Sequence, residues 1–182
     1  MPEFCKAERD GHILTVTMNR PERMNALHSP SHFEMDEIFN DFESDPELWV
    51  AIVTGAGDKA FSAGNDLKWQ AEGKKTDPPA SGFAGLVNRF NMKKPIIGAV
   101  NGLAMGGGFE VALACDIIIA AENAFFALPE PRVGLAALAG GLHRLSRQIP
   151  MKQAMGMILT GRRVMAEEGY KLGFVTEVVP EG

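Results

Sequence analysis

The sequence predicts an α/β fold. Short apolar segments that favour strands alternate with segments whose apolar residues recur at helical spacing, and strand-turn-helix units recur along the chain. The chain has 182 residues, a length that suits one domain with a sizeable core. Hydrophobic residues make up 46% and charged residues 23%, as in an ordinary globular protein. Residues 1–182 are therefore predicted to form one domain.

The first elements are a strand at residues 13–18 (ILTVTM), a loop after it, and a helix. Ser31 and Glu34 have the spacing of a capping box, which places the start of the helix there. Apolar residues then recur at i, i+3, i+4 and i+7 from Met35, which predicts an amphipathic helix. Residues 49–54 (WVAIVT) are predicted as a buried strand.

The polar segment 74–81 contains two prolines and is predicted as a mobile surface loop. After it come elements predicted from their apolar residues and turn glycines: strands at 96–100 and 117–120, a short helix between them at 109–115, helices after the glycine pair 140–141, and a last strand at 174–179.

Charge and cysteine content limit the classes of function. The net charge is −5, which disfavours a broad nucleic-acid surface. Cys5 and Cys115 form no spaced framework and favour a reducing compartment. The first residues lack the apolar core of a signal peptide, and Asp116 breaks an apolar run already too short to span a bilayer. We expect a cytoplasmic protein without nucleic-acid or membrane partners.

Several common motifs do not fit. The segment GAGDKA at 55–60 nearly matches a dinucleotide fingerprint, but neither a helix nor a correctly placed acid follows it. The sequence has no P-loop. His28 and His32 are four residues apart with Pro30 between them, so we interpret them as surface histidines and assign no metal site.

Glycine-rich backbone beside carboxylates is the feature that remains. Gly106, Gly107 and Gly108 precede a predicted helix, where backbone N–H groups can bind an anion. A second donor is available at Asn65, just after Gly64. Two such donors would form an oxyanion hole, although close-packed turns would give the same pattern.

Two glutamates lie near these donors. Glu110 follows the glycines, and Glu130 lies between two prolines in a rigid, non-helical segment. The two could share one water as general acid and base. The alternative is that Glu110 interacts with the helix dipole and Glu130 is a solvated loop residue.

Over essentially its whole length the chain resembles the enoyl-CoA hydratase/isomerase (crotonase) family. The resemblance is carried, in order along the chain, by NRPERMNAL (19–27), AFSAGNDLK (60–68), KPIIGAVNGLAMGGGFEVALACDI (94–117), FALPEPRVGL (126–135), GGLHRL (140–145) and LTGRRVMAEEGYKLGFVTEVV (159–179). It implies a spiral of ββα units, a coenzyme A thioester substrate and homo-trimers that can pair into hexamers.

The resemblance also assigns site residues. It implies an oxyanion hole formed by the N–H groups of Asn65 and Gly107, and catalytic roles for Glu110 and Glu130. It implies no metal or redox cofactor, since coenzyme A is part of the substrate. Backbone and side chains that contact coenzyme A or substrate would include Arg23, Met24, Ala63, Asp66, Leu67 and Lys68.

The chain departs from the family pattern in two places. Family hydratases commonly have proline and glycine where this chain has Ala137 and Leu138, and we expect Leu138 to narrow or reshape the acyl pocket. Family members also continue past the last strand into helices that cover the site and build the trimer. We therefore expect this C-terminal helical trimerisation region to be missing from the 182 residues.

The joint presence of both glutamates favours an enoyl-CoA hydratase, a hydro-lyase of fatty acid metabolism. Alternatives remain open. The segments AGNDLK, GFAGL and FALPE most resemble the carnitinyl-CoA dehydratase branch, with Trp69 as a candidate contact for a trimethylammonium group. A Δ3,Δ2-enoyl-CoA isomerase can function with one carboxylate, and a non-catalytic acyl-CoA-binding protein needs neither.

Overall fold

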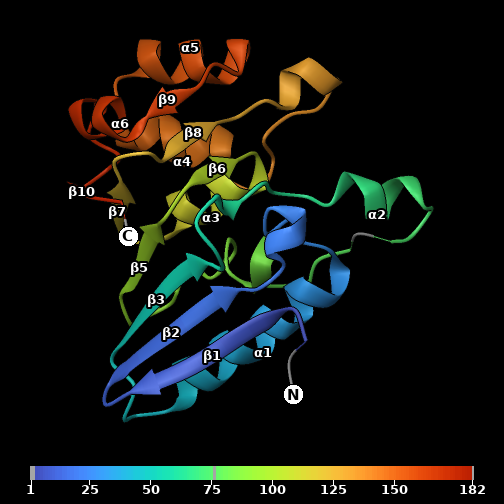
Figure 1. Ribbon diagram of the computed structural model, residues 1–182, viewed down its shortest axis with the longest axis vertical. Coiled ribbons are helices and arrows are strands. Elements are labelled where there is room, and N and C mark those ends of the chain that lie inside the picture. Colours follow the sequence, from blue (N-terminus) through green and yellow to red (C-terminus); the bar gives the residue numbers. More distant parts are fainter. Residues whose placement is uncertain (1–2, 76, 182) are drawn as a thin grey trace.

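The computed structural model describes residues 3–75 and 77–181, which form two sheets with helices around them (Figure 1). The larger sheet has six strands in the order β1-β2-β3-β5-β7-β10. All neighbours are parallel except the hairpin of β1 and β2. Its strands are β1 (Cys5–Asp10), β2 (Ile13–Met18), β3 (Val50–Gly55), β5 (Ile96–Val100), β7 (Ile117–Ala121) and β10 (Glu177–Val179).

The smaller sheet has four short strands in the order β4-β6-β8-β9, with β9 antiparallel to β8. Its strands are β4 (Ala60–Ser62), β6 (Leu103–Met105), β8 (Phe125–Ala127) and β9 (Val164–Met165). The helices are α1 (Ser29–Ser44), α2 (Leu67–Ala71), α3 (Gly107–Ala114), α4 (Gly141–Gln148), α5 (Met151–Thr160) and α6 (Ala166–Leu172), with single 3₁₀ turns η1 (Pro21–Arg23), η2 (Phe83–Gly85) and η3 (Glu130–Val133).

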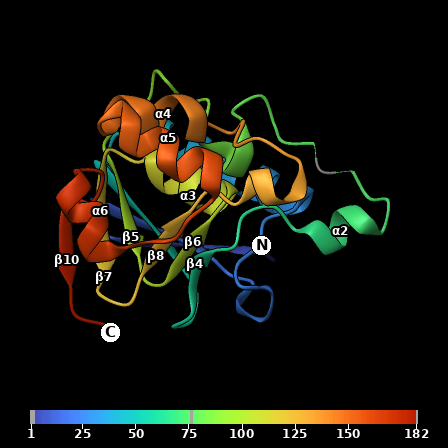
Figure 2. The ribbon, with the colours of Figure 1, turned by 90° about the horizontal axis from the view of Figure 1, so that it is seen from above.

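One unit repeats along the chain. A strand of the larger sheet is followed by a strand of the smaller sheet and then by a helical segment, as in β3-β4-α2, β5-β6-α3 and β7-β8-η3. Each turn adds the next parallel strand to both sheets, because β3, β5 and β7 are neighbours in one and β4, β6 and β8 in the other. This succession is the ββα spiral that the sequence predicts. Helix α2 projects from the body of the molecule in both views (Figures 1 and 2).

The core lies between the sheets and helices, and aromatic side chains fill its centre. Phe109, Phe126 and Phe174 contact one another with ring centroids 5.0–5.2 Å apart. Phe109 comes from α3 and Phe126 from β8, so this cluster fixes α3 against the smaller sheet. The amino end of α3, which carries the glycines, is thereby held at the carboxyl edge of β6.

Several predicted elements are confirmed and some differ at their ends. The helix predicted after residue 31 begins at Ser29, where His28 caps it by accepting from the Ser31 N–H. The capping box is wrong because Glu34 instead accepts hydrogen bonds from the N–H groups of Phe4 and Cys5. Those bonds fix strand β1, which the sequence did not predict because the strand is charged and exposed.

Two further expectations concern the surface. The sequence predicts that Trp49 begins the buried strand 49–54, but β3 begins at Val50. The Trp49 side chain is 60% exposed, and its ring stacks on His12. The described part of segment 74–81 contains neither helix nor strand, residue 76 lies outside the described residues, and the mobility of this loop stays a prediction. None of the described helices is both long and apolar enough to cross a bilayer.

Candidate active site

The glycines at the amino end of α3 are required by close neighbours. A Cβ on Gly107 would lie 2.6 Å from the ring of Phe83, and a Cβ on Gly108 would overlap the carbonyl oxygen of Ser62. Real side chains do not tolerate such contacts. The triple glycine therefore lets α3 approach both η2 and the end of β4.

The loop after β4 reaches the same point. Gly64 has a φ of 84°, and a Cβ there would lie 2.7 Å from the backbone nitrogen of Gly107. Gly64 O accepts from the Leu27 N–H at 2.7 Å, and Leu27 O accepts from the Asp66 N–H at 2.8 Å. Since successive N–H groups of an extended segment alternate in direction, the N–H of Asn65 points away from Leu27.

The two predicted oxyanion donors thus lie on adjoining segments. In residues 3–75 and 77–181, the N–H groups of Asn65 and Gly107 donate no hydrogen bond within the protein. Both residues line one pocket of about 110 Å³, whose other lining residues are Ala63, Leu67, Gly106, Pro129, Glu130, Val133 and Leu135. Unpaired N–H groups beside a pocket can bind a developing negative charge.

Glu110 lies on the first turn of α3 and is 3% exposed. Its Oε1 accepts a hydrogen bond of 2.9 Å from the N–H of Gly141, the first residue of α4. Burial raises its pKa to about 7, the nearby charge of Glu130 adds to this rise, and hydrogen bonds from the Gly141 and Ala139 N–H groups oppose it. A carboxyl group with this pKa can give or take a proton at neutral pH.

Glu130 is the first residue of η3, and its side chain lies close to Gly106. A Cβ on Gly106, which has a φ of 53°, would lie 3.0 Å from Glu130 Oε1. Glu130 Oε2 is buried without a hydrogen-bond partner in the described part of the chain, and burial raises the pKa of this carboxyl. The first glycine therefore makes room for the second carboxylate, whose charge adds to the raised pKa of Glu110.

Two of the residues expected to contact coenzyme A lie at this pocket. Ala63 and Leu67 line it, and the Ala63 N–H donates to Met24 O at 2.9 Å. Arg23 precedes Met24 and Lys68 follows Leu67 in the sequence, and both are exposed. Their contacts with coenzyme A stay predictions.

Asp66 has a structural role that the sequence did not indicate. Its carboxylate forms an ion pair of 2.8 Å with Arg20 and caps α2 through the N–H groups of Lys68 and Trp69. Burial alone would raise the pKa of Asp66, but the bonds from Trp69 and Arg20 outweigh burial and lower it. The Asp66 N–H donates to Leu27 O, and Asp66 O accepts from the Gln70 N–H. Both backbone polar groups of Asp66 are therefore already paired within the protein, and its contact with coenzyme A stays a prediction.

The expected role of Leu138 at the acyl pocket stays a prediction, and the pocket found here does not support it. Its side chain is 81% exposed and does not line the pocket. Val133 and Leu135 line the pocket instead, because η3 turns this segment toward Glu130. Ala137 is buried, close to Gly141.

The interpretation of two surface histidines is also wrong. His28 is 2% exposed because its ring packs against Phe4 and Trp69, and His32 is 0% exposed because its ring packs against Phe83 of η2. Within the described residues, no group of three or more His, Cys, Asp or Glu side chains could hold a metal ion.

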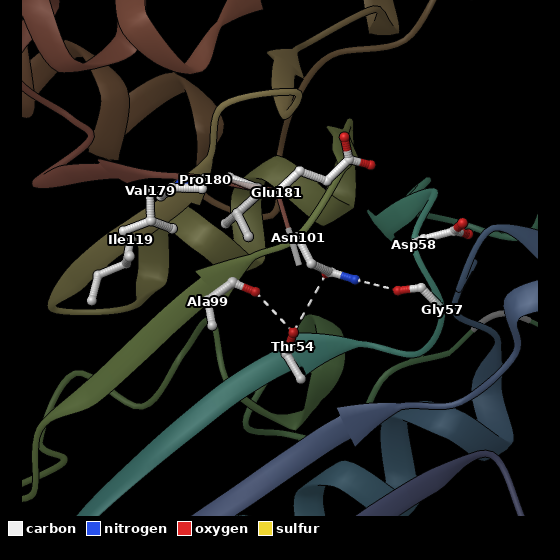
Figure 3. A pocket seen from close by; sticks show the side chains of 11 residues that line it. Thr54, Gly57, Asp58, Ala99, Asn101, Ile119, Val179, Pro180 and Glu181 are labelled. Carbon is white, nitrogen blue, oxygen red and sulfur yellow. Dashed lines mark hydrogen bonds between the residues drawn. The ribbon is translucent and has the colours of Figure 1, made fainter.

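A larger cavity, of about 420 Å³, lies at the carboxyl ends of β3, β5 and β7 (Figure 3). Two of its polar side chains, Thr54 and Asn101, bond to backbone, and the carboxylates of Asp58 and Glu181 lie on its rim. Thr54 Oγ1 donates to Ala99 O at 2.9 Å, and Asn101 Nδ2 donates to Gly57 O at 2.7 Å. The free N–H groups and Glu130 line the smaller pocket, which we take as the candidate active site. Glu110 is not among its lining residues, but its N–H donates to Gly106 O at 3.0 Å, and Gly106 does line the pocket.

Comparison with known proteins agrees with this geometry. The family model described as Enoyl-CoA hydratase/isomerase matches residues 8–182. Carnitinyl-CoA dehydratase from Escherichia coli K12 is 49% identical over 100% of this chain and 70% of the relative.

Solved structures show the same fold. A carnitinyl-CoA hydratase from Mycobacterium avium has a TM-score of 0.95 at 42% identity, over 98% of this chain and 69% of that one. An enoyl-CoA hydratase from Mycobacterium tuberculosis H37Rv has a TM-score of 0.93 at 38% identity, over 100% and 71%. The chain belongs to the enoyl-CoA hydratase/isomerase family.

Proposed function

We propose that this chain catalyses the reversible addition of water to a 2-enoyl-CoA thioester. The observation that carries the proposal is a pocket lined by two unpaired N–H groups and by Glu130, with the buried Glu110 on the adjoining first turn of α3 and the pKa of both carboxyls raised. A hydro-lyase needs both parts, because water addition moves two protons while charge builds on the thioester oxygen.

The reaction follows from these positions. The substrate carbonyl oxygen accepts from the N–H groups of Asn65 and Gly107. The ionised member of the Glu110–Glu130 pair takes a proton from water as the water oxygen bonds to Cβ. The Cα–Cβ electron pair moves toward the thioester oxygen. The protonated member of the glutamate pair then delivers its proton to Cα as the electron pair returns from the oxygen. One donor of such a hole contributes about 3 kcal/mol in acyl-transfer enzymes.

Carnitinyl-CoA dehydration is a second candidate, which the 49% identity to a carnitinyl-CoA dehydratase favours. The chemistry is the same, run toward loss of water, and only the acyl group differs. Trp69 is a weaker contact for a trimethylammonium group than the sequence suggested, since its ring already carries the Lys74 ammonium 4.3 Å from the centroid. Glu130 lines the pocket and supplies negative charge there.

The partners are also part of the proposal. We infer an acyl-CoA substrate, no separate cofactor, and a homo-trimer or hexamer. An exposed apolar stripe on α5 supports self-association, because Met151, Met155 and Leu159 recur every four residues and are 55%, 40% and 65% exposed. For a protein that includes the expected C-terminal helices, light scattering that shows only a monomer would contradict the assembly, whereas a monomer of the 182-residue chain alone would not.

Three assays with purified protein distinguish the candidate activities. Loss of enoyl absorbance from crotonyl-CoA reports hydration, and gain of absorbance from carnitinyl-CoA reports dehydration. Gain of absorbance from a 3-enoyl-CoA reports isomerisation. We expect the first two to exceed the third. Turnover of the 3-enoyl-CoA alone would favour the isomerase, and tight binding without turnover of any substrate would favour a binding protein.

A further inference from the structure

His32 is a buried polar residue that the proposed mechanism does not use. It lies in α1 with 0% exposure, directly below η2. Its Nδ1 accepts a hydrogen bond of 3.1 Å from the Ala84 N–H, so the ring proton lies on Nε2. Nε2 is buried without a partner among the described residues. A buried, half-satisfied imidazole is costly for stability alone, which suggests that its bond to Ala84 matters.

The turn that His32 holds is conformationally strained. Ala84 has a φ of 57°, in the left-handed region that residues with a Cβ rarely adopt. Gly85 follows with a φ of 59°, and its Cα packs so closely on the Asp36 backbone that a Cβ would overlap it. Such a conformation persists only where surrounding contacts fix it, and the bond from the Ala84 N–H to His32 is one of them.

The strained turn carries Phe83 onto the oxyanion hole. The Phe83 and His32 rings are 4.4 Å apart between centroids. On its other side, Phe83 packs against Gly107, where a Cβ would lie 2.6 Å from the ring carbons Cε1 and Cζ. Phe83 is therefore in direct contact with both His32 and the residue that supplies one of the two donors.

We propose that His32 is a positioning residue, which fixes the η2 turn through the Ala84 N–H so that Phe83 holds the Gly107 N–H in line with the substrate carbonyl. The inference rests on the proposed function, because it needs a thioester carbonyl in this hole. Burial lowers the pKa of His32 to about 4, with a smaller contribution from His28, so the ring is a neutral acceptor at physiological pH.

Two substitutions separate the hydrogen bond from simple packing. His32→Leu keeps apolar bulk beneath Phe83 and removes the acceptor for the Ala84 N–H. His32→Asn keeps an acceptor near the Nδ1 position and loses ring packing. If the hydrogen bond positions the turn, Asn rescues what Leu loses, whereas a purely packing role gives the reverse order.

The readout is carbonyl polarisation rather than activity alone. A conjugated 2,4-dienoyl-CoA absorbs at longer wavelength when its carbonyl oxygen is hydrogen-bonded in the hole. We expect a clear red shift with wild type, a smaller one with His32→Leu, and a near wild-type shift with His32→Asn. We also expect His32→Leu to lower kcat for hydration about tenfold with KM within about twofold, since small misalignments act on the transition state.

Phe83→Leu provides a second test if His32→Leu does not fold. It keeps His32 and removes the ring from Gly107, and we expect the same reduced red shift. A wild-type shift in folded His32→Leu, or in Phe83→Leu, would overturn the inference. Absence of any red shift and any hydration with wild type would instead overturn the proposed function, and this inference with it.

Discussion

The two walls of the candidate active site are built differently. One wall consists of the loop after β4 and the amino end of α3, where Gly64, Gly107 and Gly108 bring backbone into contact with backbone and with the Phe83 ring. The other wall consists of η3 and the segment after it, where Val133 and Leu135 are 60% and 57% exposed.

This difference separates chemistry from specificity. Backbone donors in a close-packed wall are fixed before substrate binds, and preorganised donors of this kind contribute most to catalysis. Exposed side chains on a single 3₁₀ turn can be exchanged without disturbing that packing. Substitutions in the first wall should therefore act mainly on kcat, and those in the second on substrate preference.

The largest effect is expected at Gly107. Gly107→Pro removes the N–H that stabilises the oxyanion and places ring atoms against Phe83, so turnover should be abolished. Asn65→Ala is the control, since the donor there is backbone and the side chain only bonds to Gln70 at 3.2 Å. It should keep most activity in steady-state hydration of crotonyl-CoA. Strong activity in folded Gly107→Pro would remove this residue from the hole.

The next largest effect is expected at the two carboxylates, Glu110 on α3 and Glu130 on η3. Glu110→Gln and Glu130→Gln should each lower kcat by about a hundredfold or more, because each removes an acid or base and nearly preserves shape. The double substitution should lower kcat by less than the product of the two single reductions, since the pair acts as one unit. Calorimetry should show that coenzyme A thioester binding survives in all three variants.

An uneven result would point to a different reaction. If one glutamate is essential and the other nearly silent, the isomerase becomes the better assignment. If Glu130→Gln hydrates at the wild-type rate, the mechanism with two glutamates is wrong.

The sequence predicted the first wall better than the second. Glycine runs and an acid in an apolar segment indicated function, and Asn65 and Gly107 do line one pocket. Glu110 lies on the first turn of α3 outside that lining, and its catalytic role stays a prediction. The exposed position of Leu138 could not be foreseen, because the direction of a side chain in a loop depends on the φ and ψ of each residue before it.

The short strands and the buried histidines were missed for physical reasons. Strands β4, β6, β8 and β9 have two or three residues each, too few for a period of two to be visible. His28 is covered by Phe4 and Trp69, and His32 by η2, and these are tertiary contacts that local polarity does not indicate.

The burial of Glu110 predicts a trade between activity and stability. The pKa of Glu110 in the folded protein is about 7, above the ordinary 4.5. The fold is therefore not penalised by Glu110 below pH 4.5, where the carboxyl is neutral in both states, and it loses stability as the pH rises from 4.5 through 7. Glu110→Gln should therefore stabilise the fold at pH 8 and change it little at pH 5. The expected gain is on the order of 2 kcal/mol, less than the roughly 3 kcal/mol implied by the pKa, because the glutamine amide lacks a partner.

Denaturant unfolding at both pH values measures this gain. Glu130→Gln serves as the comparison, since burial raises its pKa too and the gain should have the same sign. A stability difference between wild type and Glu110→Gln that is equal at pH 5 and pH 8 would show that Glu110 does not titrate in this range.

The smallest effect is expected on the second wall. Leu135 lines the pocket and Leu138 does not, although both are exposed leucines three residues apart. Leu135→Ala removes apolar contacts to an acyl chain worth about 1 kcal/mol, so KM for a six-carbon enoyl-CoA should rise about fivefold with kcat unchanged. Leu138→Ala should leave both within about twofold. If Leu138→Ala has the larger effect on KM, then Leu138 reaches the acyl chain when substrate is bound, and the second wall closes over its ligand in a way that the first wall cannot.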